Sequence, residues 1–164
     1  MQPAVAVRVN SARSRGHAAM LGLGVRPEQG AWVGSMVDVL ADLAHCPKSE
    51  SMSIWRRRRV VGHYRIDPDA RSVAGHGFVK PTLGLRAFFI DARWQGQGLG
   101  RAALDAMLLD LVARHPAARQ LALCVSADNS VARRLYLHTG FVDSGELNHD
   151  GRGQAQHLLL RALP

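Results

Sequence analysis

Three glycines at alternating positions, Gly96, Gly98 and Gly100, join an apolar strand pattern to a helix pattern. The strand pattern covers residues 83–90, and a helical face follows the glycines, formed by Leu104, Met107, Leu108 and Leu111. Glycine permits sharp turns and close approach of the backbone to a ligand. The unpaired N–H groups and the dipole of a helix start favour an anion. The sequence therefore predicts a phosphate site where this helix begins.

Two common phosphate-binding motifs do not fit this glycine loop. A dinucleotide fingerprint that starts at Gly96 needs its third glycine at position 101, where the chain has Arg101. A P-loop ends in Gly-Lys-Ser/Thr, and no such ending follows. Taken alone, the loop is either an anion site or a tight turn that uses glycines for close packing.

Alternating strands and helices surround the loop. Strand patterns cover residues 4–9, 51–55, 60–66, 120–125, 141–146 and 155–163. Helix patterns cover residues 13–21, 28–44 and 128–137, and Gly140 supplies a left-handed cap after the last of them. Residues 70–81 read as a loop or an irregular hairpin. This order predicts a mixed α/β sheet of the α+β kind, and the absence of repeats and linkers predicts one domain over residues 1–164.

The net charge of +8 raises the question of nucleic-acid binding. No recognised binding motif accompanies the charge, and only Trp55 adjoins the basic run Arg56–Arg59, so stacking aromatics are scarce. An arginine-rich enzyme with an anionic ligand explains the charge as well. The run itself is either a solvated hairpin turn or a site for a substrate that bears a carboxylate.

Cysteine use and hydropathy predict a cytoplasmic protein. Cys46 and Cys124 lack a metal-binding spacing, so we expect free thiols in a reducing compartment and no metal. No apolar run is long enough to span a membrane, and the first 15 residues lack the apolar centre of a signal peptide.

Two motifs carry a resemblance to a known family. Gln95-x-x-Gly98-x-Gly100 resembles the Q/R-x-x-G-x-G/A signature of the GNAT acetyltransferase superfamily. The stretch Asn129–Tyr136, followed by Gly140-Phe141, is similar to the N-x-x-A-x-x-L-Y-x-x-x-G-F element of that superfamily. Further likeness, over Val25–Gln29 and Phe88–Gly96, points to its spermine/spermidine-type branch.

The resemblance implies a central, mostly antiparallel sheet that splays at the cofactor site and is flanked by helices. It also implies acetyl-CoA as the cosubstrate and Tyr136 as the general acid that protonates the leaving thiolate. The positions that the resemblance assigns to cofactor binding are Phe89, Ile90, Gln95, Gly96, Gln97, Gly98, Leu99, Gly100, Arg101, Asn129 and Arg133. Solvent-exposed arginines and a helix-capping asparagine are the alternatives for Arg101, Arg133 and Asn129.

The implied reaction is direct attack of a primary amine on the thioester. A backbone N–H near Phe89 or Ile90 can stabilise the developing negative charge. The base that deprotonates the amine stays open among a water chain and five side chains: Glu28, Asp38, His63, His76 and Asp91.

The expected partners are acetyl-CoA and a small amine, with neither a membrane nor a nucleic acid, and dimerisation is common in the resembled family. A polyamine suits the branch, whereas 21 basic against 13 acidic residues argue against a strongly cationic substrate. Two other functions stay open: a non-catalytic acyl-CoA-binding module and, less favoured, a basic nucleic-acid-binding domain.

Overall fold

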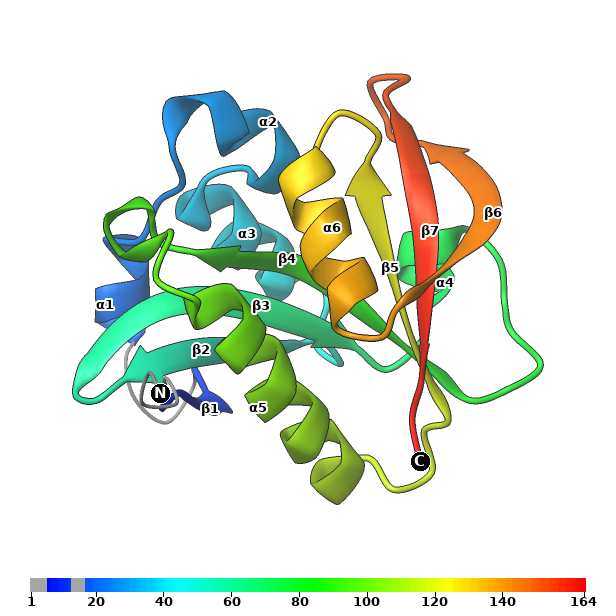
Figure 1. Ribbon diagram of the computed structural model, residues 1–164, viewed down its shortest axis with the longest axis horizontal. Helices are drawn as coiled ribbons and strands as arrows, with labels where there is room; N and C mark the ends of the chain where they lie inside the picture. Colours follow the sequence, from blue (N-terminus) through cyan, green and yellow to red (C-terminus); the bar gives the residue numbers. More distant parts are fainter. Residues whose placement is uncertain (1–5, 13–16) are drawn as a thin grey trace. The chain divides into compact units, whose positions relative to one another are not determined.

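Seven strands in the order β1-β2-β3-β4-β5-β7-β6 form the sheet of the computed structural model, which describes residues 6–12 and 17–164. The strands are β1 (Arg8–Ser11), β2 (Glu50–Arg56), β3 (Arg59–Asp67), β4 (Thr82–Ile90), β5 (Gln120–Ser126), β6 (Val142–His149) and β7 (Ala155–Ala162). Antiparallel pairing joins β1 to β2, β5 to β7 and β6 to β7, while β4 and β5 run parallel. The predicted mixed, mostly antiparallel sheet is confirmed (Figure 1).

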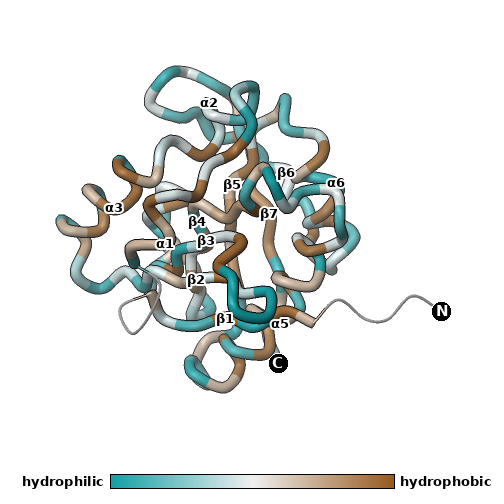
Figure 2. The backbone as a smooth tube through the Cα atoms, turned by 90° about the vertical axis from the view of Figure 1, so that its left-hand side faces the viewer, coloured by the Kyte–Doolittle hydropathy of each residue, from teal (hydrophilic) through white to brown (hydrophobic). Residues whose placement is uncertain are grey.

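The helices are α1 (His17–Leu21), η1 (Pro27–Gln29), α2 (Gly30–Val33), α3 (Met36–Ala44), α4 (Arg71–Ala74), η2 (Ala92–Trp94), α5 (Leu99–Arg114) and α6 (Ser130–His138). Figure 2 shows both hydrophobic and hydrophilic stretches along α3 and α6, as expected for helices with one buried face. Contacts divide the chain into a first unit, Met1–Arg65 with Ala87–Asp110, and a second unit, Ile66–Arg86 with Leu111–Pro164.

The first unit has a core formed by the N-terminal helices and the end of β4. Its buried members are Ala12, Met20, Leu23, Met36, Val39 and Phe89. The predicted continuous helix over residues 28–44 is wrong, because the chain breaks between α2 and α3. Gly34 adopts a φ of 79°, and the Ser35 hydroxyl accepts a hydrogen bond from the Asp38 amide, which starts a new helix.

In the second unit, Ala74 of α4 and the preceding Ala70 form a core with Ala122 of β5 and Leu158 of β7. Residues 70–81, expected as a loop or hairpin, therefore contain a short helix, which ends at Gly75 with a φ of 76°. The strand expected at residues 4–9 is found at Arg8–Ser11, and residues 4 and 5 lie outside the described part. The helix expected at residues 13–21 begins at His17 in the described chain, since residues 13–16 also lie outside it.

Candidate active site

The glycine loop lies between β4 and α5, where the sequence places it. Gly96 and Gly98 both have a φ of 75°, in the left-handed region that glycine alone adopts without strain. No atom lies within 4 Å of the position that a Cβ on Gly96 would take, so the space beside it is open. The amide of Ala102 makes the first helical bond, to the Gly98 carbonyl, and the amides before it point out of the start of α5. Both features fit a phosphate group held by backbone N–H groups.

Asp91 anchors the entry to this loop. Its carboxylate accepts hydrogen bonds from the Gly24 amide at 3.0 Å, from the Arg93 amide at 3.0 Å and from the Arg93 guanidinium at 2.8 Å. Burial alone would raise the pKa of Asp91, but these hydrogen bonds outweigh it and leave the pKa below its usual range. A carboxylate held ionised by its structural contacts shapes the turn and is a poor proton acceptor.

Gln95 braces the loop through its side chain. Its amide nitrogen donates to the Ile90 carbonyl at 2.9 Å and to the Gln29 side-chain oxygen at 2.9 Å, and Gln29 donates back at 3.2 Å. The amide of Gln95 is therefore occupied by protein groups, and η1 is tied to the loop. One residue further on, the exposed Gln97 accepts a hydrogen bond of 2.6 Å from Arg56.

The end of β4 offers a backbone edge that β3 does not use. The Asp91 amide donates to the Val61 carbonyl of β3 at 2.8 Å. Because successive amides of a strand point to opposite edges, the Ile90 N–H faces away from β3. The ladder to β5 pairs Thr82–Leu85 with Gln120–Leu123, and Ala87 follows with a φ of 48°. The register given for this ladder therefore ends before the irregular residue Ala87.

Gly62 allows β3 to lie against this end of β4. A Cβ at position 62 would come within 2.5 Å of the Phe89 carbonyl oxygen and 3.1 Å of the Ile90 Cδ1 atom. Phe89 and Ile90 are themselves buried, at 6% and 8% exposure, so β4 cannot move aside easily. Gly62 is a contributor that our sequence reasoning missed, although an isolated glycine inside the strand pattern of residues 60–66 was a signal for close backbone approach.

Tyr136 lies in the second unit, on α6. Asn129 caps this helix by accepting a hydrogen bond from the Ala132 amide at 3.3 Å, as one of its two predicted roles requires. The Tyr136 ring contacts the Phe141 ring edge-on, with 5.5 Å between the ring centres, and Tyr136 is 8% exposed. Burial raises the pKa of the Tyr136 phenol above its usual value of 10.

The two arginines assigned to cofactor binding differ in their surroundings. Arg133 donates to the Asp143 carboxylate at 2.8 Å, and this hydrogen bond is the main cause of the lowered pKa of Asp143. Its guanidinium is therefore engaged by the protein. Arg101 is exposed in the first turn of α5, two residues after Leu99, where a cation can reach an anion bound at the helix start.

His63 is a fully buried structural histidine. Its Nδ1 donates to the Ala87 carbonyl at 3.3 Å, which leaves Nε2 to accept the Ser51 hydroxyl at 3.0 Å. Burial lowers the pKa of His63 to about 4, so the ring is neutral and weakly basic at pH 7. Both ring nitrogens have partners, which argues against a role as the general base.

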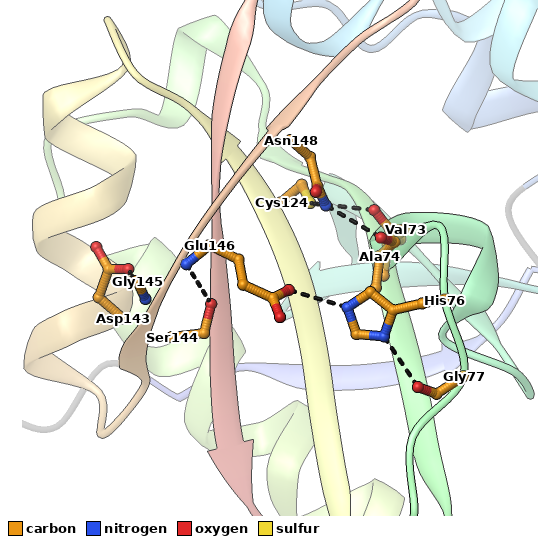
Figure 3. Close-up of polar contacts among 10 residues, drawn as sticks. All are labelled: Val73, Ala74, His76, Gly77, Cys124, Asp143, Ser144, Gly145, Glu146 and Asn148. Atoms are coloured by element: carbon orange, nitrogen blue, oxygen red, sulfur yellow. Dashed lines mark hydrogen bonds and ion pairs between the residues drawn. The ribbon is translucent and has the colours of Figure 1, made fainter.

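The other base candidates are exposed side chains of the two units. His76 donates from Nδ1 to the Gly77 carbonyl and from Nε2 to the Glu146 carboxylate, each at 2.9 Å, and these contacts, that with Gly77 first, raise its pKa (Figure 3). Asp38 accepts the Ser35 hydroxyl at 2.7 Å in the first turn of α3. Glu28 is exposed in η1, beside Gln29.

Comparison with known proteins identifies the family. The model of the acetyltransferase (GNAT) family matches residues 17–141, which is most of the chain. The chain belongs to the GNAT family. The predictions of this family and of an acyltransferase that uses acetyl-CoA are therefore confirmed.

Individual relatives agree with the family assignment. The spermine/spermidine N(1)-acetyltransferase of Bacillus subtilis is 29% identical over 149 residues, which cover 90% of this chain and 95% of the relative. The Vibrio cholerae spermidine N-acetyltransferase, solved with CoA and spermine, has a TM-score of 0.70 at 14% identity, with 95% of each chain covered. The aminoglycoside acetyltransferase AAC(6')-Ib, solved with coenzyme A, has a TM-score of 0.74 at 18% identity over 96% of this chain and 95% of the other. These two likenesses show that the fold is shared.

The described residues, 6–12 and 17–164, contain neither a membrane-spanning helix nor a metal-binding cluster. No helix there is long and apolar enough to cross a membrane. No group of three or more histidines, cysteines or acidic residues there can hold a metal ion.

Proposed function

We propose that this GNAT acetyltransferase transfers the acetyl group of acetyl-CoA to a primary amine of a small molecule by direct attack of the amine. The observation that carries this proposal is the pair of left-handed glycines, Gly96 and Gly98, at the open N-terminus of α5. Such a backbone binds a pyrophosphate chiefly through its N–H groups. The acetyl donor supplies an activated thioester, and the remaining steps fall to the residues of the chain.

The cofactor would be held by the loop and by the end of β4. The amides of the loop, from Gly96 to Arg101, are directed at the pyrophosphate, and the Arg101 side chain adds a positive charge. The free edge of β4 at Phe89 and Ile90 would bind the pantetheine arm. The Ile90 N–H is the donor we assign to the thioester oxygen, because it faces away from β3. Asn129 and Arg133 act through α6, as its cap and as its link to Asp143. Gln95 and Gln97 keep the loop in shape.

Tyr136 is the proposed general acid. Its phenol is protonated at neutral pH, as a general acid must be, and burial makes it a weaker acid by raising its pKa. For the opposite proton, on the amine, His63 and Asp91 are excluded by their structural contacts. The remaining candidates for this proton are water, Glu28, Asp38 and His76.

The proposed acceptor is a small amine, with polyamines and aminoglycosides as the first compounds to test. The named relatives act on, or were solved with, members of these classes. We further propose that residues 1–164 work as one catalytic domain in the cytoplasm, where the thiols of Cys46 and Cys124 stay reduced, and that the protein can form a homodimer.

Calorimetric titration with acetyl-CoA tests the cofactor site. Wild-type protein should bind with micromolar affinity, and Gly98→Glu should abolish binding, because the new carboxylate repels the pyrophosphate and the side chain strains a φ of 75°. Gly151→Glu, at an exposed glycine with no neighbour within 4 Å of its Cβ position, is the matched control and should bind normally. No binding to wild type contradicts the proposal.

An amine panel then tests catalysis. Acetyl transfer to spermine, spermidine or an aminoglycoside is followed by release of free CoA thiol. Tight binding of acetyl-CoA without turnover on any primary amine would favour a non-catalytic acyl-CoA-binding module instead.

A further inference from the structure

The β2–β3 hairpin concentrates arginine beside the glycine loop. Its tip carries Arg56, Arg57, Arg58 and Arg59, of which the last three are exposed. Arg57 has a φ of 54°, a conformation that glycine or asparagine adopts more easily, so an arginine is kept there at some cost in backbone strain. Arg8 of β1 reaches the same hairpin, with its guanidinium 5.3 Å from the centre of the Trp55 ring.

Arg56 connects the hairpin to the loop by two contacts. Its Nη1 atom donates to Gln97 at 2.6 Å, and its guanidinium carbon lies 5.7 Å from the centre of the Trp94 ring. The four arginines and Trp94 line a hollow of about 550 Å³. Arg56 therefore both lines the hollow and contacts the glycine loop, the proposed pyrophosphate site. All of the lining residues belong to the first unit.

The hairpin arginines have no acidic neighbours. In the part of the chain that the structure describes, no carboxylate lies within ion-pair distance of residues 56–59, whereas Arg65, Arg86, Arg93 and Arg133 each pair with an aspartate. Four adjacent guanidinium groups repel one another unless an anion lies between them. A guanidinium presents paired donors that match a phosphate, and an indole ring offers a flat face for a purine base.

We propose that the Arg56–Arg59 hairpin and Trp94 form a binding site for a phosphate monoester attached to a purine nucleoside, and that its occupant is the 3′-phosphate of the bound CoA. This inference rests on the proposed function. In CoA, one ribose links the pyrophosphate to the 3′-phosphate. When the pyrophosphate is bound by the loop, the 3′-phosphate must therefore lie within the length of one nucleoside from the loop. Because Arg56 contacts Gln97, the hairpin is the source of positive charge next to the glycine loop. The loop itself supplies only Arg101.

The hairpin would thus select CoA over its 3′-dephospho form. Calorimetry with CoA and with 3′-dephospho-CoA measures this selection. We expect wild type to bind CoA at least about tenfold more tightly than 3′-dephospho-CoA, because the latter lacks one charge-assisted contact. The double variant Arg58→Ala/Arg59→Ala should bring the ratio of the two dissociation constants close to one, while binding of 3′-dephospho-CoA stays within about twofold. Both side chains are exposed, and circular dichroism checks that the variant is folded.

Arg152→Ala is the matched control, because it removes one exposed arginine that bonds Asp150 through its backbone amide, which alanine keeps. It should leave the ratio unchanged. Equal affinity of wild type for CoA and 3′-dephospho-CoA overturns the inference but leaves the proposed function intact. Loss of all CoA binding in wild type overturns the proposed function itself.

A last experiment tests whether the hairpin binds the 3′-phosphate of CoA or a free anion. Protein saturated with 3′-dephospho-CoA is titrated with inorganic phosphate and with adenosine 3′,5′-bisphosphate. We expect binding weaker than millimolar, because the 3′-phosphate gains its affinity from being tethered to the loop. Micromolar binding that the double variant loses would mean that the hairpin serves a free phosphorylated ligand, and would overturn the assignment to CoA.

Discussion

The side-chain amides of Gln29 and Gln95 donate hydrogen bonds to each other, at 3.2 Å and 2.9 Å. Gln29 ends η1, and Gln95 opens the glycine loop and also donates to the Ile90 carbonyl. The pair joins two segments separated by 66 positions and holds the loop at the end of β4. A cosubstrate that binds backbone amides depends on this support, because the amides have no side chain to readjust.

Gln29→Ala should therefore weaken acetyl-CoA binding although Gln29 lies outside the loop. Loss of one or two neutral hydrogen bonds, each worth about 0.5–1.5 kcal/mol, predicts a dissociation constant between about twofold and about 150-fold higher. Gln95→Ala should have a larger effect, since it also releases Ile90. Calorimetry measures both, and Gln154→Ala, at an exposed glutamine, is the control. An unchanged affinity in Gln29→Ala would show that the pair does not support the loop.

Gly62→Ala should destabilise the protein by about 1–3 kcal/mol, because the added methyl group meets the Phe89 carbonyl at 2.5 Å inside a packed sheet. Urea unfolding measures the loss in the free energy of unfolding. Gly30→Ala is the matched control, since its Cβ position has no neighbour within 4 Å and its backbone is helical. It should be neutral or stabilise by up to about 1 kcal/mol. Equal stability of the two variants would refute the close approach of β3 and β4.

His63 makes stability depend on pH in a defined window. Its pKa is lowered to about 4 in the folded protein, mainly by burial and also by repulsion from Arg65, and it is 6.5 in an unfolded chain. The unfolded state therefore binds a proton that the folded state does not, and stability falls as pH drops from 6.5 toward 4. The full loss is roughly 3 kcal/mol, at 1.36 kcal/mol per unit.

The comparison of wild type with His63→Gln tests this window. Urea unfolding at pH 7.5, 5.5 and 4.5 should show a steeper loss of stability in wild type, because glutamine does not titrate. The carboxylates titrate in both proteins, so their contributions to the pH dependence cancel when the two profiles are subtracted. Parallel pH profiles for the two proteins would mean that His63 titrates normally and is accessible.

Tyr136→Phe should lower kcat by about 10²–10⁴-fold while the KM for acetyl-CoA changes little. The ring keeps its contact with Phe141, and only the proton donor is lost. Because burial raises the pKa of Tyr136, the pH profile of kcat in wild type should show no basic limb from this residue below pH 10. Steady-state rates over pH 6–10 with an active amine measure both effects. A variant with full kcat would remove Tyr136 from the mechanism.

Several features of the fold are visible in the sequence because their causes are local. The β4–glycine loop–α5 succession follows from an apolar run, from glycines and from apolar spacing within about 30 residues. Asn129 and Gly140 mark the ends of α6 by capping chemistry that acts over three or four residues. The helix expected at residues 28–44 fails for an equally local reason, since the weak breaker Gly34 and the cap Ser35 outweigh the apolar periodicity.

The chemical state of the candidate residues was not visible in the sequence. His63 and Asp91 look like bases in the sequence, yet burial and contacts with Ala87 and Gly24 make them structural. Arg133 looks available for a phosphate, yet Asp143 engages it. Each of these outcomes depends on a partner from another element, and no pattern of spacing records such a partner.

The sequence by itself determined the family, the glycine loop and the order of strands and helices, because these depend on neighbouring residues and on motifs that survive without the fold. Only the tertiary structure decided that Gln29 braces Gln95, that Gly62 admits β3 beneath Phe89 and that Arg56 brings an arginine cluster to Gln97. The physical reason is that hydrogen bonding, burial and charge pairing act through space between residues 27 to 66 positions apart.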